Sequence, residues 1–194
     1  MGAFSNNAFN NFKLQKEFVI SALGKLNISP QNVLPGLITY GLSASVQSNI
    51  GDISTYSQLV NILNSLNTPL NGNNILAAMR LARTNLFLPA KGSRATVPKV
   101  LWVFVDKAAA NDANAFRDEA QKLINLGVHL IVVGIGSEIS RPDLDVVAGG
   151  HGVIIFDPTD VITQIKPVID ITTPGQYKIF PSYVLDLGFT QGGH

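Results

Sequence analysis

The stretch LINLGVHLIVVGIGSEISRPDLDVVAG, residues 123–149, decides the fold of this chain. At its centre, VHLIVVGI (128–135) is almost continuously apolar, which is typical of a strand covered on both faces of a sheet. Gly127 precedes this strand and ends a helix predicted over 112–126. RPDLDVVA (141–148) predicts a short helix after the strand. A helix, a buried strand and a second helix in this order indicate a parallel α/β sheet.

Outside this stretch, the spacing of apolar residues divides the chain into further helices and strands. Val100–Val105 is continuously apolar and indicates a central strand covered on both faces. Because almost nothing separates Val33–Leu42 from Ser43–Ile50, these two strands are expected to pair as an antiparallel hairpin. In chain order, the sequence predicts helix 12–26, strand 33–42, strand 43–50, helix 54–66 capped by Ser54, turn 71–74, helix 75–86, strand 97–105, helix 112–126 capped by Asp112 or Asn111, strand 128–135, helix 141–148, strand 152–156, helix 160–169 and strand 179–185.

This alternation predicts an α/β fold: a doubly wound, mostly parallel central sheet with one antiparallel edge strand and helices on both faces. The chain has 194 residues, which suggests one domain, and 46% of them are hydrophobic, enough for a sizeable core. Only 14% are charged and the net charge is +1, which argues against binding to nucleic acid or to an anionic membrane. No apolar run approaches the roughly 18 residues that a membrane span needs.

The composition leaves the compartment open. The absence of cysteine excludes disulfides, thiolate metal sites and cysteine nucleophiles, but a chain of this size needs no disulfide outside the cell. Met1–Asn11 is polar and rich in asparagine, without the apolar core of a secretion signal. Few charges and many Asn, Ser and Gln residues predict a polar, uncharged surface, as on an extracellular or matrix protein. Compositional drift in the host proteome explains the same pattern equally well.

Polar side chains follow two of the predicted strands and precede one of the helices. Asp106 follows one strand, Asp186 and Thr190 follow another, and the turn 71–74 leads into a helix. In open α/β sheets, ligands bind at the carboxyl ends of the strands. Carboxylate, hydroxyl and amide oxygens are hard donors, so together they indicate a small magnesium or calcium site. The alternative is that Asp106 and Asp186 only cap following helices.

Residues 12–170 resemble a von Willebrand factor A (VWA) domain, the fold shared with integrin inserted domains. FKLQKEFV (12–19) is similar to the first helix of that family, and PKVLWVFVD (98–106) resembles its fourth strand. Residues 123–149 are the most specific part, because they resemble the family's run of helix, Gly, strand, Gly-x-Gly and short acidic helix. The resemblance implies a Rossmann-like sheet with helices on both faces.

The family's first strand, which ends in an Asp-x-Ser-x-Ser loop, is absent from the N-terminus, whereas YVLDLGFT (183–190) resembles it. The chain is therefore expected to be circularly permuted, to be a fragment of a tandem array, or to exchange this strand between molecules. The predicted division is a VWA-like domain over 1–170 that lacks its first strand, a linker over 171–178, and a first-strand equivalent over 179–194.

All three explanations place the first-strand equivalent in the centre of the sheet. We expect Ser182–Asp186 to lie between the strands Leu34–Leu42 and Val100–Val105 and parallel to both. Pro181 must then lie near the start of the strand, because proline cannot donate a hydrogen bond to a neighbouring strand.

The resemblance also implies a metal-ion-dependent adhesion site, in an incomplete form. Its ligands in this chain would be Asp186, Thr190, Asn73 and Asp106. Gly188 stands where the family has its first serine and offers no side-chain oxygen. Asn73 stands in place of a threonine, and Lys107 follows Asp106 where a glycine is usual. If Lys107 points inward, it could neutralise one carboxylate, so binding of Mg²⁺ or Ca²⁺ is expected to be weak or absent, and the alternative is a polar cluster that holds no ion.

The function implied by the resemblance is that of a secreted, non-enzymatic module that binds another protein of the extracellular matrix, with collagen as one candidate. Two alternatives stay open: a structural module that self-associates through an exchanged strand, and an intracellular A-type domain of a larger assembly. An enzyme is not indicated, because no nucleophile–base pair and no raised carboxylate pair stands out in the sequence.

Overall fold

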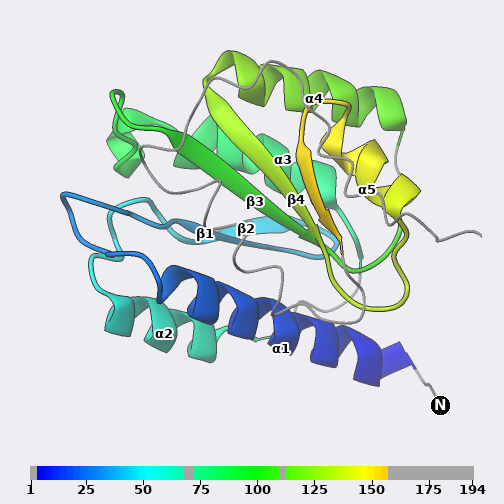
Figure 1. Cartoon of the computed structure of the whole chain (residues 1–194), viewed down its shortest axis with the longest axis horizontal. Helices are drawn as coiled ribbons and strands as arrows, with labels where there is room; N and C mark the ends of the chain where they lie inside the picture. Colours follow the sequence, from blue (N-terminus) through cyan, green and yellow to red (C-terminus); the bar gives the residue numbers. More distant parts are fainter. Residues whose placement is uncertain (1–3, 68–71, 110–111, 157–194) are drawn as a thin grey trace, which may run out of the picture.

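The computed structural model describes residues 4–67, 72–109 and 112–156 (Figure 1). In chain order the elements are α1 (Phe4–Leu23), β1 (Leu37–Tyr40), β2 (Ala44–Ser48), α2 (Tyr56–Ser65), α3 (Ile75–Leu81), the π-helical turn η1 (Ala82–Leu86), the 3-10 turn η2 (Pro89–Lys91), β3 (Lys99–Val105), α4 (Ala113–Asn125), β4 (Val128–Gly134), α5 (Arg141–Ala148) and β5 (Val153–Phe156). The helix, linker and strand predicted over 160–185 lie outside the described residues.

β3, β4 and β5 form a parallel three-stranded sheet in the order of the chain. Lys99 is aligned with Val128 at one end of the β3–β4 pair, and Val105 is aligned with Gly134 at the other. α4 connects β3 to β4, and α5 connects β4 to β5. The α/β class, the parallel strands and the bounds of α5 predicted from the sequence are therefore confirmed.

β1 and β2 form the antiparallel hairpin that the sequence predicts, with Tyr40 opposite Ala44. In the part of the chain that the structure describes, this hairpin is a sheet of its own and does not pair with β3. Among the described residues β3 therefore pairs with β4 alone, and its central position in the sheet stays a prediction. The strand expected between β1 and β3, Ser182–Asp186, lies outside the described residues.

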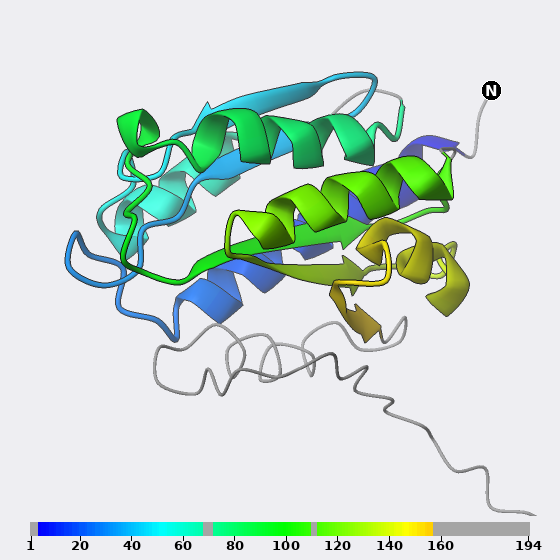
Figure 2. The ribbon, with the colours of Figure 1, turned by 90° about the horizontal axis from the view of Figure 1, so that it is seen from above.

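Helices cover both faces of the parallel sheet (Figures 1 and 2). On one face, Phe116 of α4 and Leu144 of α5 pack with Val132 of β4 and with side chains of α3. On the other face, Phe18 of α1 packs on Ile131, and α2 lies beside α1. Because successive side chains of β4 point to opposite faces, one strand serves both cores. No helix among these residues is long and apolar enough to cross a membrane.

α1 begins at Phe4, well before the predicted start at Phe12, and ends at Leu23. The predicted helix 12–26 was therefore wrong at both of its bounds. Phe4, Ala8 and Phe12 have the spacing of four that places apolar residues on one helix face, so the signal was present in the sequence.

The helix caps correct one expectation and decide another. Thr55, and not Ser54, caps α2: its side chain accepts a hydrogen bond from the Gln58 amide, while the Gln58 side chain accepts one from the Thr55 amide. This reciprocal capping box satisfies two amides that the helix leaves free. Asp112 caps α4 by accepting a hydrogen bond from the amide of Asn114, which excludes Asn111 as the cap.

Candidate functional site at the carboxyl end of the parallel sheet

Asp106 follows β3 directly and is half-buried at the carboxyl end of the sheet. Asn11 of α1 donates a hydrogen bond from Nδ2 to Asp106 Oδ2 over 3.4 Å. The Asn11 amide also lies against Gly136, where an added Cβ would approach it within 2.9 Å. Because Asp112 caps α4, Asp106 does not have the capping role that the sequence left open. Its carboxylate contacts α1 through Asn11 instead.

Asn73 connects the loop before α3 to the loop after β3. Its Nδ2 donates hydrogen bonds to the carbonyl of Lys107 over 3.2 Å and to that of Ala108 over 2.9 Å. The next residue, Asn74, caps α3 by accepting a hydrogen bond from the Ala77 amide over 3.1 Å. The two loops that carry Asn73 and Asp106 are thus brought together, as expected for two loops at one end of a sheet.

Tyr40 adds a third contact at this end. Its hydroxyl donates a hydrogen bond to the backbone carbonyl of Phe104 in β3. Burial raises the pKa of the Tyr40 hydroxyl well above its usual value, and the nearby Asp106 carboxylate raises it further. The hydroxyl is therefore held in its protonated, donating form.

Sequence reasoning did not single out Tyr40 or Asn11. Tyr40 is the last residue of a strand, and strand ends were already the place to look, so a signal existed for it. Asn11 could not be found in the same way, because the prediction began the helix after it. Both residues surround Asp106 with neutral polar groups rather than with a second charge.

Lys107 is exposed, and no ion pair joins it to Asp106 among the residues that the structure describes. The suggestion that Lys107 points inward and neutralises a carboxylate is therefore not supported.

Two of the four predicted metal ligands, Asp106 and Asn73, lie among the described residues. They contribute one carboxylate, from Asp106, and one amide, from Asn73; no group of three His, Cys, Asp or Glu side chains that could hold a metal occurs among the described residues. Magnesium prefers six oxygen ligands in octahedral geometry, several of which can be water. Asp186 and Thr190, the other predicted ligands, lie outside the described residues. The donor chemistry at the carboxyl end of β3 fits a hard cation, but these residues alone do not form its site.

Among curated proteins, the chain is similar to a collagen chain. The chain is 26% identical over 129 residues to the collagen alpha-6(VI) chain of Mus musculus, which covers 66% of this chain and 6% of that protein. It therefore spans a small fraction of the length of the curated relatives it matches.

Several solved structures have the same fold. Proximal thread matrix protein 1 from the mussel byssus superposes with a TM-score of 0.73 at 20% identity, over 84% of this chain and 42% of that one. A further structure of that protein, described as having a zinc-occupied MIDAS motif, has a TM-score of 0.72 at 19% identity, over 84% and 43% of the two chains. The manganese-loaded TRAP protein of Plasmodium vivax has a TM-score of 0.65 at 17% identity, over 83% of this chain and 67% of that one.

The family model of the von Willebrand factor type A domain matches residues 5–167. This range contains every helix and strand that the structure describes except the first residue of α1. The chain therefore belongs to the von Willebrand factor type A domain family.

Proposed function

We propose that this chain is a non-enzymatic protein-binding module of the extracellular matrix. The observation that carries the proposal is the match of the family model over residues 5–167, together with the similarity to the collagen alpha-6(VI) chain. The polar, weakly charged surface implied by 14% charged residues agrees with a secreted protein. Detection of the native protein in the matrix fraction of its source tissue would support this location, and confinement to the cytosol would contradict it.

The proposed binding surface is the end of the sheet where the loops of Asn73 and Asp106 meet. Hydrogen bonds from Asn73 fix the relative position of the two loops. A rigid, polar loop cluster at the carboxyl ends of parallel strands is where such sheets recognise ligands. Another matrix protein is the proposed partner, with collagen as the first candidate to test.

A weak divalent-metal site is the second part of the proposal, with Asp186, Thr190, Asn73 and Asp106 as ligands and Mg²⁺ or Ca²⁺ as the ion. Its support is the half-buried carboxylate of Asp106 and the metal-bound state named for two structural neighbours. Gly188 supplies no ligand, so we expect an affinity in the millimolar range, as in low-affinity oxygen sites.

Thermal melting tests the metal site. An ion that binds only the folded chain raises the melting temperature, and at tenfold its dissociation constant the rise is about 3–6 °C for a chain of this size. We expect this rise with Mg²⁺, Ca²⁺ or Mn²⁺ and its loss in Asp186→Ala and Asp106→Ala. The control is Asp118→Ala, which removes a carboxylate that is 64% exposed on α4. An equal rise in all variants, or none in any, would refute the proposed ligands.

Binding to immobilised collagen tests the partner separately. We expect the chain to bind, and Asp106→Ala to weaken binding at least tenfold while Asp118→Ala does not. Loss of binding in EDTA would show that the metal contributes directly. If Asp106→Ala and Asp118→Ala bind alike, the interface lies elsewhere; if the unmodified chain does not bind, collagen is excluded as the partner.

Self-association through an exchanged strand is the second candidate function. The observation that favours it is the separate hairpin: neither β1 nor β3 pairs with a further strand in the described part of the chain. Open strand edges are sites at which chains pair with one another. A dimer whose population rises with concentration in light scattering would favour this function, whereas a monomer at all concentrations would exclude it.

A further inference from the structure

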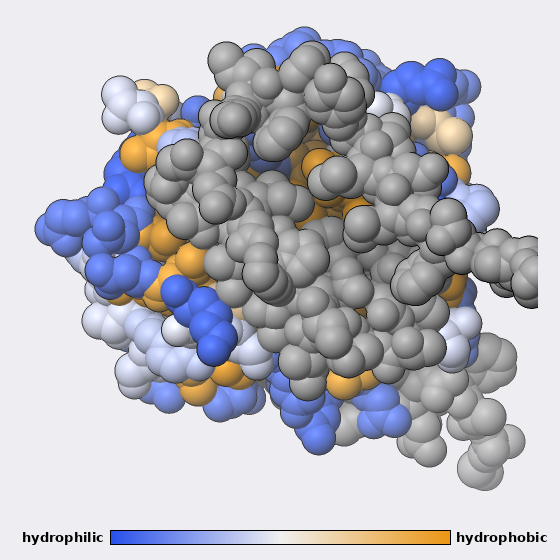
Figure 3. Space-filling model, viewed as in Figure 1, coloured by the Kyte–Doolittle hydropathy of each residue, from blue (hydrophilic) through white to orange (hydrophobic). Residues whose placement is uncertain are grey.

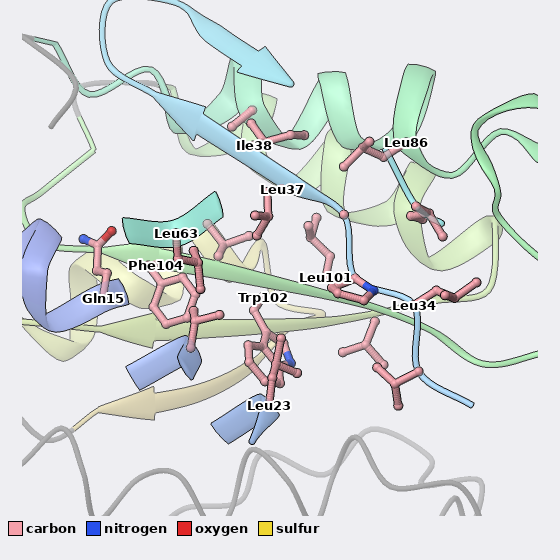
Figure 4. A pocket seen from close by; sticks show the side chains of 18 of the residues that line it. Gln15, Leu23, Leu34, Leu37, Ile38, Leu63, Leu86, Leu101, Trp102 and Phe104 are labelled. Carbon is pink, nitrogen blue, oxygen red and sulfur yellow. The ribbon is translucent and has the colours of Figure 1, made fainter. Parts of the chain in front are cut away.

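β1 and β3 face each other across an interval that contains a cavity of about 1020 Å³. Its lining includes all of β1 and residues 99–104 of β3. Figure 4 shows Leu37 and Ile38 on one side of it and Leu101, Trp102 and Phe104 on the other, with the two strands running in the same direction. We name this space the β1–β3 interval. Two parallel strands with facing free edges are the boundaries that one further strand would require.

The two strands that border the β1–β3 interval are less buried than β4. β4 has a neighbour on each side, and each of its residues except His129 is buried. β3 is similarly apolar, yet Trp102 and Phe104 are only partly buried, and so is every residue of β1. Helices cover both faces of β3, so this exposure arises from its open edge. Figure 3 shows apolar surface exposed beside hydrophilic surroundings on the face viewed in Figure 1.

The backbone of β3 presents hydrogen-bonding groups to the interval. The Val105 carbonyl points toward β4, where it accepts a hydrogen bond from the Ile135 amide over 2.9 Å. The Phe104 carbonyl points the other way, because it accepts from the Tyr40 hydroxyl of β1. Successive residues of a strand alternate in this respect, so the amide and carbonyl groups of Trp102 and Val100 also point into the interval. A strand lying there would donate backbone amides to the carbonyls of Trp102 and Val100, while Tyr40 already bonds to that of Phe104.

The occupant must be apolar on both of its faces. Side chains of helices close the interval from both sides of the sheet, among them Val19, Leu23, Leu63, Met79 and Leu86. A strand between two such layers is a continuous apolar run, as in β4. The most apolar run among residues 157–194 is IFPSYVL, residues 179–185, which also carries no charge.

We propose that Ser182–Leu185 of the same chain occupies the β1–β3 interval as a strand parallel to β3. Its length matches the four residues of β1. Pro181 precedes it and so has no ladder hydrogen bond to donate. Asp186 then follows this strand as Asp106 follows β3, and the two carboxylates reach the same end of the sheet.

The connection from β5 is long enough. The interval lies three strand spacings from β5, about 14 Å. The helix predicted over 160–169 would return about 15 Å along the sheet, and residues 170–181 span up to about 40 Å when extended. The crossover also has the favoured hand. From β3 to β5 the chain crosses the face on which α4 and α5 lie. The connection from β5 to the β1–β3 interval runs in the opposite direction across the sheet. It is therefore right-handed when it crosses the other face, where α1 lies.

A segment of the same chain is expected to fill the β1–β3 interval in preference to the same segment of a second copy. A tether that can reach its site gives an effective concentration in the millimolar range, well above the concentration at which a dilute protein meets its copies. At micromolar concentration the strand of the same molecule therefore fills the interval first.

A designed disulfide tests this placement, because the chain has no cysteine of its own. With Asp186 level with Asp106, Val184 lies level with Phe104. On β1, the Tyr40 hydroxyl contacts the Phe104 carbonyl, so the preceding residue, Thr39, is the position chosen opposite Val184. Neighbouring strands bring their Cα atoms within disulfide range. We expect Thr39→Cys/Val184→Cys to oxidise within the monomer at least tenfold faster than the control Ser57→Cys/Val184→Cys, in which Ser57 is exposed on α2. Disulfides confined to dimers would assign the interval to a second copy, and a rate equal to that of the control would refute the proposal.

Hydrogen exchange gives a second test, which uses the unmodified 194-residue chain and needs no substitution. The amides of Trp102 and Phe104 point into the interval and are expected to exchange within about tenfold of the rates of Ile131 and Val133, in the doubly paired β4. Exchange as fast as in the exposed turn at Gly51 would show that no strand lies against β3, and would overturn the proposal.

Discussion

A partly buried ion pair connects two helices on one face of the sheet. Glu119 of α4 is 1% exposed, and its two carboxylate oxygens accept hydrogen bonds from Arg83 Nε over 2.5 Å and from Arg83 Nη2 over 3.2 Å. The hydrogen bond to Glu119 raises the pKa of Arg83 further, so the guanidinium stays charged. Arg80 Nε lies 3.9 Å from the same carboxylate. This two-point contact fixes the π-helical turn η1 against α4.

Removing one partner of this pair is expected to be costly. Arg83→Met leaves the Glu119 carboxylate buried with only the more distant Arg80, and the free energy of unfolding should fall by about 3 kcal/mol. Urea denaturation measures this change. Lys122→Met is the control, because it breaks an exposed pair between Lys122 and Asp118, which should contribute less than about 0.5 kcal/mol.

The double variant Arg83→Met/Glu119→Leu separates the two contributions. Replacing both partners by apolar side chains removes the buried unpaired charge and should recover most of the lost stability. If Arg83→Met costs no more than Lys122→Met, the pair does not stabilise the fold.

At the scale of single elements, two glycines that follow helices differ in their surroundings. Gly127 follows α4 with φ +73° and has nothing within 4 Å of an added Cβ. Gly149 follows α5 with φ +59°, and an added Cβ would lie 2.8 Å from the Cα of Arg117 and 2.9 Å from the carbonyl of Phe116. Both occupy left-handed backbone conformations, but only at Gly149 does the main chain of α4 also exclude a side chain.

Alanine substitution should therefore separate conformational strain from steric contact. Gly127→Ala should lower the free energy of unfolding by about 1 kcal/mol, the cost of a left-handed alanine. Gly149→Ala should lower it by at least twice as much, because α5 must also move away from α4. Urea unfolding of the two variants checks the ratio, and equal losses would show that α5 adjusts without cost.

The elements differed in how well the sequence predicted them. β4 and α5 lie close to their predicted bounds. For β4 the reason is its continuous apolar run between Gly127 and Gly136, which indicates a buried strand. β1 is shorter than the predicted strand 33–42, because Pro35 cannot take part in a ladder. The start of α1 was missed because residues 4–11 are rich in asparagine, which has low helix propensity.

At the scale of the whole molecule, the proposed strand makes the C-terminal segment part of the core. Deleting residues 177–194 should leave β1 and β3 with open edges and abolish cooperative melting, or cause aggregation through those edges. Calorimetry and light scattering on the shortened chain measure both effects. A soluble fragment that melts cooperatively at the temperature of the full chain would show that the segment is an accessory.

The candidate site could be predicted only in part from the sequence. Asp106 and the turn 71–74 were found from their positions at the ends of predicted elements, and the family resemblance singled out Asn73 within that turn. The structure brings the two loops together. Tyr40 and Asn11 were not found, because their roles depend on distances across the sheet between residues far apart in the chain. The hairpin was predicted, and its separation from β3 agrees with the prediction that a further strand lies between them; the placement of that strand stays a prediction, because residues 182–186 lie outside the described part of the chain.

The chain contains one tryptophan, Trp102 of β3, and it lines the β1–β3 interval. The ring of Trp102 is 6.4 Å from that of Phe18 and 6.4 Å from that of Phe104, centroid to centroid, and in Figure 4 it lies beside the cavity. An indole surrounded by apolar side chains fluoresces at shorter wavelength than one in contact with water. Because no other indole contributes, the ultraviolet emission of the unlabelled protein reports directly whether water or polypeptide adjoins β3.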